Sequence, residues 1–291
     1  MKILCTTEWA FGRDRALLRS FETALSERPV RLHDLQTDPE LNRTLVAFSG
    51  TRGDVAEGVL ALAADAMDRA NLERHVSPIP RLGALDLCAW TILDEGPFVE
   101  AQEALDVLAI TFSARYLVPV FYQERSDPIR SEGFIPSLRR GGFGGLLDRR
   151  LEPNVGPVTA HPRLGVSVMG IGPARLTFTT EIQTSELDWG SNLVRKANRL
   201  RGQGDSRFLG VQTSSVSVGI QNSRRLFFDL TLPEITAADP IVEWLTAEAN
   251  DQGVRFQTPR LLGAISQADR LGATRLSMDA RQVIEEAWLH D

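Results

Sequence analysis

The sequence has few cysteines and no long apolar run. Only Cys5 and Cys88 occur in 291 residues, both in apolar, strand-like stretches, so we interpret them as reduced core residues rather than a disulfide. No apolar segment approaches the ~20 residues that a membrane-spanning helix needs. Residues 1–4 lead directly into an apolar segment without a signal-peptide pattern. We therefore expect a cytoplasmic protein that does not enter a membrane.

Short motifs of several enzyme classes are also missing. There is no Walker A sequence and no G-x-S-x-G, and no G-x-G-x-x-G fingerprint is completed, which argues against P-loop, serine-hydrolase and dinucleotide sites. No C-x-x-C occurs, and the histidines lie too far apart for a local metal motif, so we expect no metal. A net charge of −6 gives no reason to expect nucleic-acid binding.

What is present is a series of strands and helices that runs twice. In the first half, apolar spacing predicts strands at 3–9, 30–35, 44–48, 82–93 and 118–122 and helices at 12–27, 54–70 and 98–116. Residues 123–173 are rich in proline and glycine and predict an irregular lid, binding loop or connector. The second half predicts strands at 175–184, 208–218, 226–232 and 254–265 and helices at 187–200, 239–250 (N-cap Asp239) and 280–289.

Three local echoes support a duplication. C-T-T-E-W recurs as F-T-T-E-I, N-R-T-L-V-A-F as R-R-L-F-F-D-L, and I-P-R-L-G as T-P-R-L-L-G, at nearly one offset. Chance similarity among apolar strands is the alternative. Duplication predicts an α+β protein of two ferredoxin-like (split βαβ) subdomains, residues 1–174 and 175–291, each a four-stranded antiparallel sheet with helices on one face. The bare sheet faces are then expected to form a ligand groove.

Two of these segments resemble a known family. N-R-T-L-V-A-F-S-G (42–50) and P-R-L-G-A-L-D-L-C (80–88), with P-N-V-G-P (153–157), resemble glutamate formiminotransferases. These enzymes move a formimino group from formiminoglutamate to tetrahydrofolate. The resemblance implies a folate tunnel between two ferredoxin-like subdomains, tetrahydrofolate as co-substrate, an acyl-glutamate-like ligand and a homodimer. It covers the transferase part only, without a cyclodeaminase.

The departures from the family pattern concern proton transfer. The family's catalytic base is the histidine directly before P-R-M-G, and that position is Ile79 here, which cannot accept or donate a proton. By ungapped counting, an acidic residue that supports this histidine falls on Gln36. A family asparagine becomes Asp229. The outer histidine of the motif remains, as His75.

Each candidate site residue has a second interpretation. His75 is either a relocated acid/base or an exposed or capping histidine at a helix end. Arg43 and Arg81 either clamp a carboxylate or form structural ion pairs, for instance with Asp86. Glu8, with its echo Glu181, and Asp229 face either the groove or solvent. The predicted site is therefore His75 as the catalytic residue, with Glu8, Gln36, Asn42, Arg43, Ile79, Arg81, Asp86 and Asp229 binding substrate or folate.

Three functions fit this pattern. The first is a folate-dependent formimino or formyl transferase with altered acid/base groups. The second is an inactive homologue that binds a folate, a small anion or a partner chain. The third is a different enzyme on the same scaffold, because a fold alone does not fix a reaction.

Overall fold

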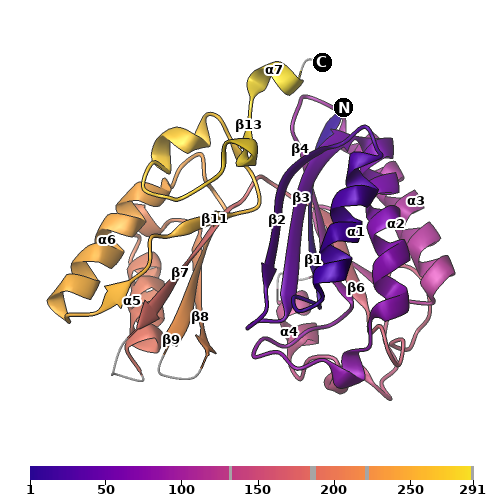
Figure 1. The fold of residues 1–291 in the computed structure, drawn as a ribbon, viewed down its shortest axis with the longest axis horizontal. Coiled ribbons are helices and arrows are strands. Elements are labelled where there is room, and N and C mark those ends of the chain that lie inside the picture. The colour runs from indigo at the N-terminus through magenta and orange to yellow at the C-terminus, as the bar shows by residue number, and fades with distance from the viewer. Residues whose placement is uncertain (131–132, 184–187, 220–222, 290–291) are drawn as a thin grey trace. The chain divides into compact units, whose positions relative to one another are not determined.

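The chain folds as two compact units, Met1–Gly172 and Pro173–Asp291, called the first and second unit below. The computed structural model describes residues 1–130, 133–183, 188–219 and 223–289 (Figure 1). Both units combine helices with sheets that are largely antiparallel, so the predicted α+β class is confirmed.

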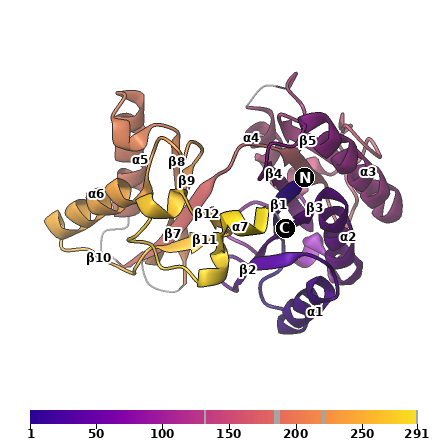
Figure 2. The same cartoon turned by 90° about the horizontal axis from the view of Figure 1, so that it is seen from above.

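The first unit is a six-stranded sheet with three long helices on one side (Figures 1 and 2). The strand order is β2-β3-β1-β4-β6-β5, in which β6 pairs parallel with both neighbours and the other pairs are antiparallel. Its elements are β1 Lys2–Trp9, α1 Arg15–Ser26, β2 Arg31–Asp38, β3 Arg43–Thr51, α2 Arg52–Arg69, η1 Leu72–Arg74, β4 Leu85–Ile92, α3 Phe98–Tyr116, β5 Val120–Glu124, α4 Phe134–Arg139, η2 Gly144–Leu146 and β6 Ser167–Ile171.

Strand β6 corrects two predictions for this unit. The sheet is not four-stranded and antiparallel, and residues 123–173 are not irregular throughout, because they contain α4 and β6. Every residue of β6 is buried. Parallel strands that are covered on both faces are continuous apolar runs rather than alternating ones. The run is only five residues long and lies among prolines and glycines, which hid it from a periodicity argument.

Alternation along β1 separates its two faces. Ile3, Cys5 and Trp9 are buried in the core under the helices, whereas Glu8 lies on the opposite, partly exposed face.

Cys5 and Cys88 are both free, with their Sγ atoms 3.8 Å apart. Burial raises the pKa of the Cys5 thiol well above its usual range. The prediction that both cysteines lie in the core is confirmed.

The second unit is an antiparallel sheet with α5 and α6 on one side (Figure 1). The strand order is β10-β7-β9-β8, and β11 also pairs with β7. The first four strands of the first unit, β2-β3-β1-β4, follow the same order. Its elements are β7 Leu176–Gln183, α5 Trp189–Gly202, η3 Ser206–Phe208, β8 Val211–Val218, β9 Ser223–Leu230, α6 Ala238–Asp251, β10 Arg255–Phe256, β11 Arg260–Leu262, β12 Ile265–Ser266, η4 Asp269–Gly272, η5 Ala280–Gln282, β13 Val283–Ile284 and α7 Glu286–Leu289.

The end of the chain departs most from prediction. The expected strand 254–265 is divided into β10, β11 and β12, separated by Pro259 and by Gly263 at φ +83°. The expected helix 280–289 is reduced to single turns on either side of β13. Asp239 is not the N-cap of α6, because Ala237 holds that position and the Asp239 carboxylate accepts hydrogen bonds from the 274–275 segment. The predicted start at Leu187 lies outside the described residues.

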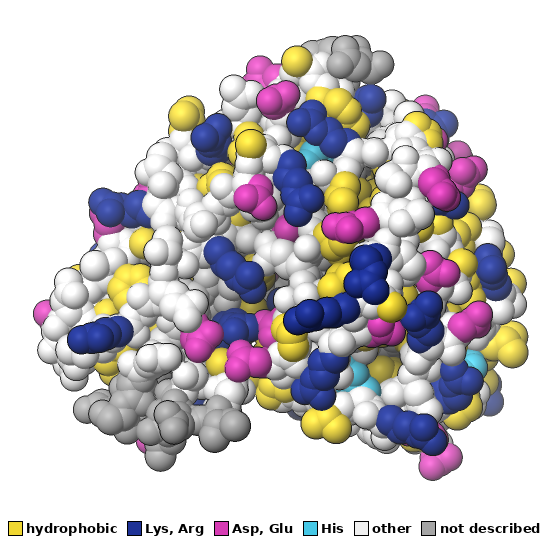
Figure 3. Space-filling view, viewed as in Figure 1, with side chains coloured by type: hydrophobic (Ala, Val, Ile, Leu, Met, Phe, Trp, Pro, Cys, Tyr) yellow, Lys and Arg dark blue, Asp and Glu magenta, His cyan; other side chains and the backbone are white. Residues whose placement is uncertain are grey.

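The surface mixes charges of both signs. On the face shown in Figure 3, lysine and arginine side chains lie among aspartate and glutamate side chains. Within the described residues, none of the helices combines the length and the apolar character that crossing a bilayer requires.

Candidate functional site

Two arginines in the first unit share one carboxylate. Glu8 lies on the face of β1 away from the helices, Arg43 begins β3, and Arg81 precedes β4. Arg43 Nη1 lies 3.3 Å from Glu8 Oε1, and Arg81 Nη1 lies 3.4 Å from Glu8 Oε2. Strand pairing of β1 with both β3 and β4 therefore assembles a cationic cluster from three segments that are distant in sequence.

A second carboxylate, that of Asp86, forms an ion pair with Arg81. It is fully buried, and its Oδ1 accepts hydrogen bonds from the backbone N–H groups of Leu82 (2.6 Å) and Gly83 (3.3 Å). Its Oδ2 accepts from Arg139 of α4 and lies 3.6 Å from Arg81 Nη1. A Cβ on Gly83 would lie 1.8 Å from the Val166 carbonyl oxygen, so only glycine permits this turn. The structural ion pair that the sequence left open is present.

Arg81 keeps two donors without an acceptor. Its side chain is almost wholly buried, with 4% of the residue exposed. Nε and Nη2 are both buried and have no hydrogen-bond partner among the described residues. Burial lowers the pKa of Arg81, while the charges of Glu8 and Asp86 raise it. Buried donors almost always find an acceptor, so a ligand or ordered water is expected here.

Asn42 fixes the orientation of His75. Asn42 has a left-handed backbone (φ 48°) between β2 and β3. Its Oδ1 accepts from the Gly12 N–H at 2.9 Å, which assigns Nδ2 as the donor to His75 Nδ1 at 3.1 Å. With Nδ1 accepting, the ring proton is on Nε2. His75 Nε2 is buried and has no partner in the described part of the chain.

The environment keeps His75 neutral. Burial and, to a smaller extent, the positive charges of Arg81 and Arg13 lower its pKa to about 4, while the charge of Asp86 opposes them. At pH 7 the ring is therefore uncharged, with Nε2–H as a hydrogen-bond donor. It is a poor general base at this pH, because its conjugate acid is too strong.

This shift predicts a pH dependence of stability. An unfolded histidine has a pKa of 6.5, so the unfolded chain binds the proton more tightly than the folded one. The contribution of neutral His75 to the free energy of unfolding is therefore complete above pH 6.5, and it is lost as the pH falls toward 4. We expect the urea midpoint of the wild type to decrease more between pH 6.5 and 4.5 than that of His75→Gln. Equal pH slopes for the two proteins would contradict the assignment.

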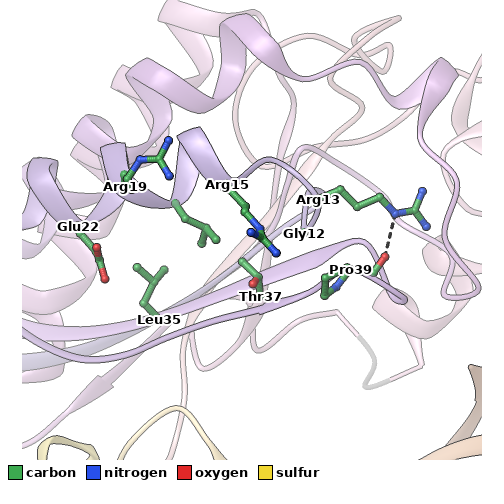
Figure 4. A pocket seen from close by; sticks show the side chains of 9 residues that line it. Gly12, Arg13, Arg15, Arg19, Glu22, Leu35, Thr37 and Pro39 are labelled. Atoms are coloured by element: carbon green, nitrogen blue, oxygen red, sulfur yellow. Dashed lines mark hydrogen bonds between the residues drawn. The ribbon is translucent and has the colours of Figure 1, made fainter. Parts of the chain in front are cut away.

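A cavity of ≈ 550 Å³ lies between α1 and β2 of the first unit (Figure 4). Three arginines, Arg13, Arg15 and Arg19, line it with one carboxylate, Glu22. Arg13 Nε donates to the Pro39 carbonyl oxygen at 2.8 Å, and its charge also acts on His75. Sequence analysis missed these arginines. The available signal was R-D-R at the start of a helix that is otherwise amphipathic. The lining residues are Gly12, Arg13, Arg15, Leu18, Arg19, Glu22, Leu35, Thr37 and Pro39.

The remaining predicted residues lie apart from these contacts. Gln36 on β2 donates through Nε2 to Oδ2 of the buried Asp34 at 2.7 Å. Ile79 is half-buried, and its backbone N–H donates to Ser77 Oγ at 3.1 Å. Asp229 belongs to the second unit, where it pairs with Arg175 at 2.7 Å. Thus contacts join Glu8, Arg43, Arg81 and Asp86, and separately Asn42 and His75.

Metal chemistry finds no support in the described residues. They contain no group of three or more histidine, cysteine, aspartate or glutamate side chains that is placed to hold a metal ion. The polar atoms that lack partners near Arg81 and His75 are N–H donors. Such donors suit an anionic or carbonyl ligand.

A comparison of the sequence with known protein families identifies the family to which the first unit belongs. Residues 2–172 match the family described as formiminotransferase domain, N-terminal subdomain. The match spans the first unit, which holds the clusters around Arg81 and His75.

Curated relatives extend the similarity at low identity. The chain is 24% identical over 294 residues to formimidoyltransferase-cyclodeaminase of Rattus norvegicus, covering 97% of this chain and 54% of that protein. It is 24% identical over 205 residues to glutamate formimidoyltransferase of Streptococcus pyogenes, covering 69% and 68%. It is 21% identical over 272 residues to glutamate formimidoyltransferase of Thermoplasma acidophilum, covering 90% and 88%. The chain spans about half the length of the mammalian relatives it matches.

Proposed function

The chain belongs to the formiminotransferase-domain family, and we propose that it is a folate-dependent transferase of one-carbon groups with altered proton-handling residues. Tetrahydrofolate is the proposed co-substrate, and an acylated glutamate is the proposed donor. The names of the relatives support the reaction class. The first unit supplies the groups that we assign to substrate binding.

The observation that carries this proposal is the pair of buried donors on Arg81. Nε and Nη2 form one edge of the guanidinium, where both N–H bonds point the same way. This edge matches the two oxygens of a carboxylate in a bidentate pair. Glu8 and Asp86 interact with Nη1 instead, so they do not satisfy the two donors of this edge. A carboxylate, such as that of an acylated glutamate, satisfies both donors at once.

His75 has a second role in the proposal. Its neutral ring presents Nε2–H, which can hydrogen-bond to a carbonyl or imino group of the substrate and hold the reacting carbon in place. It does not replace the missing base at Ile79, since a ring with a pKa of about 4 takes up protons weakly at pH 7. We therefore expect slow turnover by the wild-type protein.

The same two residues favour a second candidate function, a homologue that binds these ligands without turnover. Ile79 cannot transfer a proton and His75 is kept neutral, whereas Nε and Nη2 of Arg81, which we assign to carboxylate binding, are both present without a partner in the described residues. Binding without catalysis distinguishes this candidate from the transferase.

Thermal unfolding with ligands tests the proposal. Tetrahydrofolate and formiminoglutamate should each raise the melting temperature, because a ligand at 100 times its Kd stabilises the native state by about 2.7 kcal/mol. Arg81→Lys keeps the charge beside Glu8 but removes the bidentate edge, and it should weaken formiminoglutamate binding at least about tenfold. Arg52→Lys, in an exposed pair with Glu100, is the matched control.

The outcomes separate the candidates. Ligand binding with measurable formimino transfer supports the transferase, and binding without transfer supports the inactive homologue. If neither ligand shifts the melting temperature, or if Arg81→Lys binds formiminoglutamate as tightly as the wild type, the proposed site is wrong.

A further inference from the structure

The second unit repeats the arrangement of one carboxylate and two arginines. Glu181 lies on β7, Arg225 directly opposite it on β9, and Arg260 on β11, which pairs with the other edge of β7. Arg225 Nη2 lies 3.2 Å from Glu181 Oε2. In the first unit, β1 carries Glu8, β3 begins with Arg43, and Arg81 precedes β4. Strand β1 pairs with β3 and β4 on its two edges, as β7 pairs with β9 and β11. The P-R-L echo in the sequence relates Arg81 to Arg260.

These three residues line a cavity of ≈ 220 Å³ that lies wholly within the second unit. The alternation of β7 explains its position, because Phe178 and Ile182 are in the core and Glu181 points to the opposite face. Side chains of threonine and glutamine supply the rest of the wall. The full lining is Thr179, Thr180, Glu181, Arg225, Gln257, Thr258 and Arg260.

The cavity carries one positive charge in excess. Two guanidinium groups face one carboxylate, and that carboxylate pairs with Arg225. Arg260 is exposed, and its side chain forms no ion pair or hydrogen bond with any residue that the structure describes. The charge of Arg260 also lowers the pKa of Arg225, after the larger effect of burial. The two guanidinium groups are thus close enough to repel each other, and an anion between them would remove that repulsion.

We propose that this cavity is a second ligand site, which binds a small monocarboxylate through Arg260, with the Thr258 and Gln257 side chains as further polar contacts. A net charge of +1 matches one carboxylate. Glu181 repels a dianion such as phosphate. The volume is below the ~300–1,000 Å³ typical of sites for drug-sized ligands, so a small acid fits better than a whole folate. The proposal does not depend on the transferase function proposed above.

Calorimetric titration of the full chain with N-acetylglycine tests this site. This probe is a monocarboxylate with one amide, and N-acetylglycinamide is the same molecule without the charge. We expect saturable binding of the acid, no binding of the amide, and weaker binding of inorganic phosphate, all at constant ionic strength. Phosphate that binds more tightly than the acid, or amide that binds equally well, would overturn the carboxylate assignment.

Variants assign the binding to this cavity. Arg260→Gln should weaken binding at least about tenfold, as expected when a charge-assisted hydrogen bond is lost. Arg255→Gln, an exposed arginine on neighbouring β10, should stay within about twofold of the wild type. Arg52→Lys, which changes an exposed arginine of the first unit, should also leave binding unchanged. Unaltered binding by Arg260→Gln, or no saturable binding by the wild type, contradicts the proposal.

The carboxylate of Glu181 provides an independent check. Glu181→Gln raises the net charge of the cavity, and the ratio of phosphate to N-acetylglycine affinity should rise at least about threefold. An unchanged ratio would show that Glu181 does not control the charge of the ligand.

Discussion

Asp86→Ala is expected to lower the free energy of unfolding of the first unit by about 3–5 kcal/mol, the usual cost of breaking a buried ion pair. Asp86 is fully buried and accepts hydrogen bonds from two backbone N–H groups and from Arg139. Alanine leaves these donors without an acceptor. It also leaves Arg81 with Glu8 as its one carboxylate in the described structure, at 3.4 Å.

Two comparisons make this measurement specific. Asp86→Asn retains an oxygen for the backbone donors but loses the charge and the acceptor that Arg139 uses, so it should cost less than alanine, about 1–3 kcal/mol. Glu243→Ala removes an exposed pair with Arg275, whose side chains are 58% and 53% exposed, and should cost at most about 1 kcal/mol. Urea denaturation gives the overall change, and hydrogen exchange of peptides from β1 and β4 resolves the first unit. A loss no larger for Asp86→Ala than for Glu243→Ala would contradict the prediction.

Much of the fold could be predicted because local spacing of apolar residues dictates it. Helix α3 has the predicted bounds, Phe98–Tyr116, since a long run with Pro97 before it has few alternatives. Strand β6 could not be found in this way. Its burial on both faces depends on α3 and on neighbouring strands, and parallel pairing leaves no turn signal in the sequence.

The site was predictable only as a set of residue types. The P-R-L-G-A-L-D segment suggested an ion pair of Arg81 with Asp86, which the structure contains. The contact of Asn42 with His75 joins segments 33 residues apart through a left-handed backbone, and no local pattern specifies it. Arg139 of α4 completes the Asp86 cluster from a segment that looked irregular. Long-range pairing, rather than residue type, decides which charges meet.

Ile79→His should increase the rate of formimino transfer from formiminoglutamate to tetrahydrofolate by about 10²–10⁴-fold, the usual contribution of a general acid or base. The residue lies directly before Pro80 and Arg81, where the resemblance to glutamate formiminotransferases expects the catalytic histidine. Ile79 is half-buried, and an imidazole is similar in size to its side chain. Ile79→Gln, which is polar but does not titrate in this pH range, is the control.

The structure argues against adding Gln36→Asp to this variant. Gln36 Nε2 donates to the buried Asp34 carboxylate at 2.7 Å, so an aspartate at position 36 would place two carboxylates in contact. One of them would have to take up a proton or move away, and stability would be lost. The single variant should therefore be faster and more stable than the double variant. If Ile79→His binds both substrates yet is no faster than Ile79→Gln, position 79 does not face the reacting groups. The missing base would then not explain slow turnover.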